Sequence, residues 1–129
     1  MLFTLARIFA CGIWLFAGLF KLTHFKGTTE DMAQRGIPMP AFFLVITLMI
    51  EFGGTLLLFT NSLVWLVGLV WIVFVIVATP VYHGKIIVDG KINFPEYVQF
   101  SKNLSIMDAM FALIALDPNK PAWLLAWVN

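Results

Sequence analysis

The chain has 129 residues, of which 61% are hydrophobic and 12% are charged, and its mean hydropathy is +0.95. An ordinary soluble domain is roughly 45–50% apolar and about 25% charged, so a soluble fold of this size cannot bury so much apolar surface. The net charge of +1 gives no basic surface of the kind that binds nucleic acid. A single cysteine, Cys11, excludes an internal disulfide, a CxxC redox pair and a cysteine zinc cluster. The composition predicts an integral membrane protein whose main partner is the lipid bilayer.

Three long apolar runs predict membrane-spanning helices over residues 2–20, 41–60 and 63–82. Each approaches the roughly 20 residues that a helix needs to cross about 30 Å of hydrocarbon. The first run has no basic region ahead of it and no clear small-x-small site before Lys21, so we interpret it as a retained helix rather than a cleaved signal peptide. Only Asn61 and Ser62 separate the other two runs, which predicts a hairpin with almost no loop.

A fourth span is predicted over residues 95–116. The apolar run from 104 to 116 is too short by itself, but Asn93, Pro95 and Glu96 form the pattern of an N-cap, a proline near the first position and a glutamate three residues after the cap. A helix that starts there has about 22 residues, or roughly 33 Å at 1.5 Å per residue. The expected fold is therefore all-α, a bundle of four transmembrane helices.

The connecting segments are short. Residues 28–31 resemble a capping box and residues 36–40 a stop signal, which predicts a two-turn helix lying at the membrane interface between the first two spans. Residues 84–94 predict a loop or a short hairpin. After the fourth span, Trp123 and Trp127 are typical of a tail in the headgroup region.

Four spans place both termini on the same side of the membrane. The opposite side carries six basic residues, whereas the terminal side has only Lys120 and the intramembrane Arg7. The six are Lys21, Lys26, Arg35, Lys85, Lys91 and Lys102. By the positive-inside rule the termini are expected on the outer, periplasmic side of the cell membrane.

Arg7, Glu51 and Asp108 lie inside three different predicted spans. Each such group costs at least about 2.5–3.5 kcal/mol at the centre of an isolated helix, so we expect the three to face one another or water. At 1.5 Å per residue from the terminal side, Arg7 lies roughly 8 Å deep, Asp108 about 12 Å and Glu51 about 14 Å. We therefore predict a contact between Arg7 and Glu51. Glu51 and Asp108 are candidate proton-transfer groups, because two acids facing one arginine leave one acid without a partner.

Helical spacing predicts a second polar layer at the mouth of the bundle. Arg7, Cys11, Trp14, Gly18 and Lys21 follow one another at steps of three and four, so they share one face of the first span. His83 ends the third span on the same side of the membrane as Lys21, Lys102 and Asn103. The candidate site thus has His83 as a third proton-transfer group and Arg7, Lys21, Lys102, Asn103 and Trp14 as substrate-binding groups.

These residues resemble the DoxX family of small four-helix membrane proteins. The similar segments are residues 6–8, 16–22, 36–40, 51–54, 78–83 and 102–104, in the family's order. The resemblance covers nearly the whole chain and implies a single DoxX-like domain over residues 1–129. It also implies an association with membrane redox chemistry, since some relatives are subunits of quinone-linked oxidoreductases such as thiosulfate:quinone oxidoreductase. Asp108 lies outside the family's pattern.

Each candidate has a structural alternative. Arg7 and Glu51 can form an ion pair that only fixes helix register, and His83 can be a simple helix-end residue at the interface. Lys21 and Lys102 can extend to the headgroups. Trp14 and Trp71 can pack in the core. Haem ligation is not expected, because both histidines, His24 and His83, lie near one face of the membrane.

Two classes of function remain open. One is a subunit of a redox system whose polar core binds a quinone headgroup or a small substrate, with no intrinsic cofactor or metal and with electrons supplied by a partner subunit. The other is a noncatalytic adaptor or assembly factor whose ionic core only holds the bundle together.

Overall fold

The computed structural model describes residues 1–128, and the side chains of residues 127 and 128 lie outside this description, as does the predicted headgroup position of Trp127. The described chain contains six helices and one two-stranded hairpin. In chain order they are α1 (Leu2–Thr23), α2 (Phe25–Gln34), α3 (Pro40–Phe59), α4 (Val64–His83), β1 (Ile87–Val88), β2 (Lys91–Ile92), α5 (Phe94–Leu116) and α6 (Ala122–Val128).

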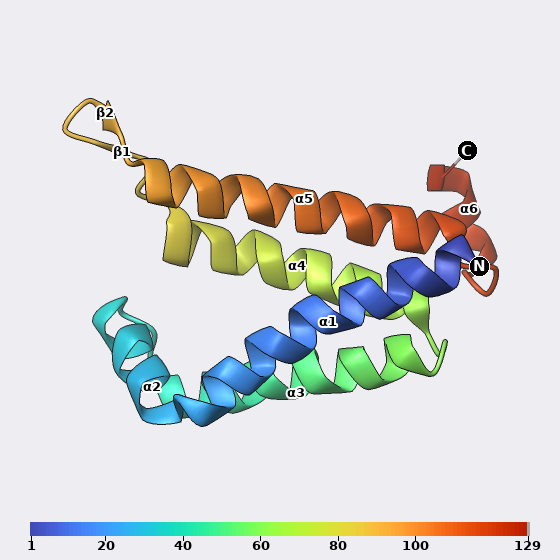
Figure 1. Cartoon of the computed structure of the whole chain (residues 1–129), viewed down its shortest axis with the longest axis horizontal. Helices are drawn as coiled ribbons and strands as arrows, with labels where there is room; N and C mark the ends of the chain where they lie inside the picture. The colour runs from blue at the N-terminus through green and yellow to red at the C-terminus, as the bar shows by residue number, and fades with distance from the viewer. Residues whose placement is uncertain (129) are drawn as a thin grey trace.

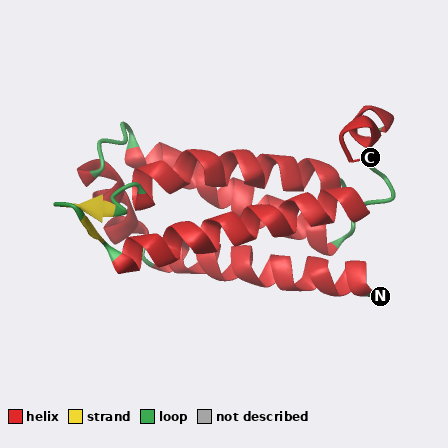
Figure 2. Ribbon diagram, turned by 90° about the horizontal axis from the view of Figure 1, so that it is seen from above, coloured by secondary structure: helices red, strands yellow, loops and turns green. Residues whose placement is uncertain are grey.

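Four long helices, α1, α3, α4 and α5, lie side by side as one bundle (Figures 1 and 2). The closest packing is between α1 and α3 and between α4 and α5. Both termini lie at one end of the bundle, and α2 and the hairpin lie at the other, as Figure 1 shows. We call these the terminal end and the hairpin end.

Three of the long helices match the predicted apolar runs within three residues at each boundary. Among the described residues, α1, α3 and α4 are long and apolar enough to cross a membrane. The fourth, α5, has 23 residues and lies along α4, but it carries Lys102, Asn103 and Asp108 within its length.

Turn residues set the boundaries of α2 and α3. Gly36 has a φ of +80°, and the Ile37 amide donates to the Met32 carbonyl, which is the left-handed arrangement that ends many helices. Pro40 occupies the first position of α3, where its missing N–H costs nothing. The predicted capping box at residues 28–31 is wrong, because α2 already begins at Phe25 and the Thr28 hydroxyl donates to the His24 carbonyl one turn earlier.

The connection between α4 and α5 is the short hairpin that the sequence predicts as one of two possibilities. Asp89 and Gly90 both have positive φ angles, +51° and +73°, as a two-residue hairpin turn requires. Asn93 precedes α5, but its side chain makes no capping bond. The predicted capping pair of Asn93 and Glu96 is therefore wrong, because Glu96 pairs with His83 instead.

Large side chains cover the outside of the bundle as well as its core. Trp71, Leu58 and Met110 are almost fully buried where the helices meet. Many large apolar residues are nevertheless exposed, among them Phe9 at 74% and Val73 at 61%. Such a surface is stable only against hydrocarbon, so the structure supports the membrane environment predicted from the composition.

Candidate functional site

A cavity of about 530 Å³ lies toward the hairpin end, where residues of all four long helices, α2 and the segment after it meet. Apolar residues of α3 and α4 make most of its wall. The polar side chains on its lining are Lys21, Thr28, Thr47, Tyr82, His83 and Asn103. The structure thus brings together three residues of the predicted polar layer, Lys21, His83 and Asn103.

Lys21 and Glu51 form an ion pair beside this cavity. Lys21 Nζ lies 2.6 Å from Glu51 Oε1, and the exposed fractions of the two side chains are 26% and 1%. Lys21 Nζ also lies 3.4 Å from the Ala17 carbonyl, so its stem runs back along α1 into the bundle. The lysine therefore reaches a carboxylate that is buried in the bundle and still lines the cavity with its own surface.

Gly18 lets Glu51 approach α1 closely. A Cβ at Gly18 would lie 3.0 Å from the Phe52 ring and 3.3 Å from Glu51 Oε2. Within the described part of the chain, no group donates a hydrogen bond to that buried Oε2 atom. One oxygen of Glu51 is thus committed to Lys21, and the other keeps acceptor capacity inside the bundle.

Two further contacts order the rim of the cavity. His83 Nδ1 lies 2.9 Å from Glu96 Oε2, which joins the end of α4 to the start of α5. The Asn103 amide donates to the Thr79 hydroxyl at 3.0 Å. Lys102, in contrast, does not line the cavity, because it points to Gln99 on its own helix.

The predicted contact between Arg7 and Glu51 is wrong. Arg7 instead donates from Nη1 to the Leu58 carbonyl at 2.9 Å, and its guanidinium lies 5.2 Å from the centre of the Phe3 ring. Leu58 is in the last turn of α3, where its carbonyl also accepts from the Asn61 amide at 3.2 Å and where a cation is favourable. Arg7 therefore stabilises the end of a helix, and Glu51 pairs with Lys21.

Asp117 is a polar residue whose role the sequence did not reveal. Its side chain is 1% exposed and accepts hydrogen bonds from the amides of Trp65 and Asn119, each at 2.9 Å. Trp65 is in the first turn of α4, so Asp117 caps that helix from a distant part of the chain. In the sequence, the only signal at Asp117 is the proline that follows it. That signal predicts where α5 ends, but it does not predict a cap on α4.

Trp14 lies in the core between the two ends of the bundle. Its ring stacks on Trp71 with centroids 4.3 Å apart, and Trp71 donates from Nε1 to the Ile50 carbonyl at 3.2 Å. Trp71 also covers Gly54, which leaves no room for a Cβ there. Trp14 is not among the residues that line the cavity, so the structure favours the packing interpretation.

Asp108 does not join the other polar groups. The apolar residues Met110, Leu113 and Ile114 set the rotation of α5, because they are buried in the core of the bundle. This rotation places Asp108 on the exposed side of the helix. The expectation that the three intramembrane charges face one another is therefore wrong for Asp108.

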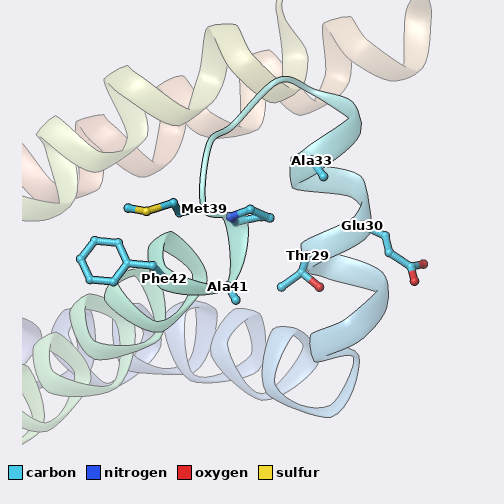
Figure 3. Close-up of a pocket in the computed structure, with 7 residues that line it drawn as sticks. Thr29, Glu30, Ala33, Met39, Ala41 and Phe42 are labelled. Atoms are coloured by element: carbon cyan, nitrogen blue, oxygen red, sulfur yellow. The ribbon is translucent and has the colours of Figure 1, made fainter.

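A second hollow lies outside the bundle, between α2 and the start of α3 (Figure 3). Thr29, Ala33, Met39 and Phe42 line it, and the Glu30 carboxylate points away from the centre. It is shallow and open, and the Lys21–Glu51 pair does not reach it. In the described chain, moreover, no three His, Cys, Asp or Glu side chains gather closely enough to hold a metal ion.

The long apolar helices and the apolar outer surface define an integral membrane protein. Residues 2–84 match the family model DoxX, which is more than half of the chain, so the chain belongs to the DoxX family. It is similar to Inner membrane protein YphA of Escherichia coli K12, with 26% identity over 118 residues that cover 92% of this chain and 84% of that protein. It is also 29% identical over 116 residues to Inner membrane protein YqjF of the same organism, covering 88% and 82%. No solved structure matches the chain.

Proposed function

We propose that this chain is an inner-membrane subunit of a quinone-linked redox system and that the cavity at the hairpin end binds the quinone headgroup. In this proposal α5 is the fourth membrane span, α2 lies at the interface and both termini face the periplasm. The observation that carries the proposal is a cavity of about 530 Å³ with a buried ion pair at its side.

The length and place of α5 support its role as a span. Its 23 residues give roughly 35 Å at 1.5 Å per residue, comparable with α1, α3 and α4. It lies along α4 for much of its length, as Figure 1 shows. The similarity to two proteins named as inner membrane proteins supports the location.

The cavity has the size and chemistry of a small-molecule site. Such sites typically have volumes of about 300–1,000 Å³ and are mainly apolar, with a few polar groups that orient the ligand. Here the apolar wall suits a quinone ring. The Lys21 ammonium and the Asn103 amide are donors for a carbonyl oxygen, and both residues line the cavity.

The opening of the cavity suits a lipid-soluble ligand. Phe43 on α3 and Val77 and Val81 on α4 line the cavity and are 40%, 63% and 41% exposed. These residues belong to helices that are apolar enough to cross the membrane. A ligand dissolved in the bilayer can therefore enter between α3 and α4 without passing through water.

Lys21 and Glu51 are the candidate proton-transfer pair in this proposal. Reduction of a quinone to a quinol takes two electrons and two protons, and the electrons come from a redox enzyme that acts as partner. Lys21 faces the cavity, so it can give a proton to a ligand oxygen. The Glu51 carboxylate can then take up a proton that comes from water and pass it to the neutral lysine, and two such rounds supply the two protons of the quinol. His83 at the rim is the candidate link to water, through its contact with Glu96.

A noncatalytic adaptor is the second candidate function. The observation that favours it is the terminal end, where Arg7 donates to the Leu58 carbonyl and Asp117 accepts from the amides of Trp65 and Asn119. Charges used in this way hold a bundle together and do no chemistry.

Quinone binding distinguishes the two candidates. The purified protein in mild detergent is titrated with a short-chain quinone, and the Ala78→Phe variant is compared with Val73→Phe. Ala78 lines the cavity, whereas Val73 is 61% exposed on the outside of the same helix. We expect saturable binding that Ala78→Phe weakens at least tenfold and Val73→Phe leaves within twofold. If the quinone instead partitions equally and without saturation into the wild type, Ala78→Phe and Val73→Phe, the adaptor function is favoured.

A further inference from the structure

The outward face of α5 differs from the outward faces of the other long helices. Large apolar side chains such as Phe16, Met49 and Ile76 cover α1, α3 and α4 on the outside. On α5 the exposed positions 105, 108, 109 and 112 are occupied by small or polar side chains, and the exposed large residues Val98, Leu104, Phe111 and Leu116 lie beside and beyond them. We call this set the α5 outer strip, and it comprises Ser105, Asp108, Ala109 and Ala112.

Asp108 is the residue that makes this strip unsuitable for contact with lipid. Among the described residues, the side chains of α5 that form polar contacts are Glu96, Gln99, Lys102, Asn103 and Ser105, and none of these contacts reaches Asp108. The Ser105 hydroxyl is satisfied within its own helix by the Ser101 carbonyl. An ionisable group inside a membrane normally faces a partner or a water-filled space.

The small residues beside Asp108 favour a helix as the partner. Alanine and serine at these spacings let two backbones approach closely, which is how transmembrane helices associate in lipid. The opposite side of α5 is already occupied, since Ile114 packs over Gly68 of α4. A further helix can approach α5 most closely at the outer strip, because its side chains are smaller than those of the exposed Leu104 and Phe111 beside it.

A second copy of this chain does not offer the charge that Asp108 lacks. Two copies that pair through α5 with the same membrane orientation would place Asp108 against Asp108. Arg7 and Lys21 are already bound inside the bundle, and Lys120 donates to the Ala115 carbonyl. Lys102 lies six residues from Asp108, roughly 9 Å along the helix.

We infer that the α5 outer strip binds a transmembrane helix of a different protein, and that this helix carries a lysine or arginine at the depth of Asp108. The inference rests on the proposed role of α5 as a membrane span and is independent of quinone binding. The partner helix supplies a cation to Asp108 and contacts the two alanines with its own small residues.

The test uses designed transmembrane peptides in bicelles, with association measured by energy transfer. One peptide is a leucine–alanine helix with a single lysine placed to match Asp108, and its control has leucine in that position. We expect the wild-type chain to bind the lysine peptide at least tenfold more tightly, and Asp108→Asn to remove this preference. A third peptide carries glutamate in the same position, and the Asp108→Lys variant should prefer it. The Ile76→Ala variant, changed on the outside of α4, should behave as wild type. Equal affinity of the wild-type chain for the lysine peptide and its leucine control would overturn the inference.

Two further measurements distinguish the other outcomes. In a Cys11→Ala background, Ala112→Cys reports on self-association, and a disulfide-linked homodimer formed in the membrane would overturn the inference in favour of a second copy. Asp108→Cys in the same background reports on depth. Rapid labelling of that cysteine by a water-soluble maleimide would show that α5 does not cross the membrane, and the span proposal would fail with it.

Discussion

The two ends of the bundle use buried charge in different ways. At the terminal end, Arg7 binds the Leu58 carbonyl and Asp117 binds the Trp65 amide, so each charge compensates the end of a helix. At the hairpin end, Lys21 and Glu51 bind each other, and one of them lines a cavity. We propose that the cavity next to the Lys21–Glu51 pair, rather than depth in the membrane, distinguishes a charge with a ligand-binding role from a structural one.

The largest effect is expected from splitting the pair at the hairpin end. Lys21→Met leaves the Glu51 carboxylate buried and unpaired, and removing one partner of a buried pair typically costs about 3–5 kcal/mol. The double variant Lys21→Met with Glu51→Leu should recover most of this loss, because an apolar pair suits that environment. Melting curves in detergent measure the stability of the single and the double variant. A single variant that melts like the wild type would show that the pair contributes nothing to folding.

A smaller effect is expected between the two ends, where Trp71 packs on α3. A Cβ at Gly54 would lie 2.7 Å from the Trp71 ring, so Gly54→Ala should cost about 1–3 kcal/mol. Gly53 is the matched control, because its Cβ would have no described neighbour within 4 Å and alanine is the better helix former. We expect Gly53→Ala to be neutral or stabilising by up to about 1 kcal/mol. Equal melting temperatures for the two variants would contradict this packing.

The smallest effect is expected at the terminal end. Asp117→Ala removes the cap of α4, and losing such a cap typically costs about 0.5–2 kcal/mol. Asp117→Asn should retain most of the stability, since an amide oxygen still accepts from the Trp65 amide. The control is Asp108→Asn, which in detergent and without a partner should leave the melting temperature unchanged. A larger loss from Asp108→Asn than from Asp117→Ala would show that Asp108 has a role inside the bundle.

The sequence predicted the helices better than the contacts between them. The length of the apolar runs predicted α1, α3 and α4. Pro40 marked the start of α3, and Gly36 marked the end of α2. Depth counted along the helix paired Arg7 with Glu51 wrongly, because it ignored the direction of the side chains. Side chains on a helix lean toward its N-terminus, so Lys21 at the end of α1 reaches back past Ala17 into the bundle.

Rotation about the helix axis explains the other errors. The outward position of Asp108 depends on which apolar residues of α5 pack on α4, and the large residues Met110 and Ile114 decide it. The cap that Asp117 provides depends on where α5 ends relative to the start of α4, which no local pattern records. The cavity likewise arises only when residues of all four long helices and α2 are placed together.

The most direct test of the account compares ligand binding and stability at the two ends in one experiment. A short-chain quinone is titrated into the double variant Lys21→Met with Glu51→Leu and into Arg7→Met, and the melting temperature of each is measured in the same detergent. We predict that the double variant melts near the wild type but binds at least tenfold more weakly. Arg7→Met should melt earlier and keep its affinity within twofold. The reverse pattern, with binding lost at Arg7 and kept in the double variant, would contradict the assignment of the ligand site to the hairpin end.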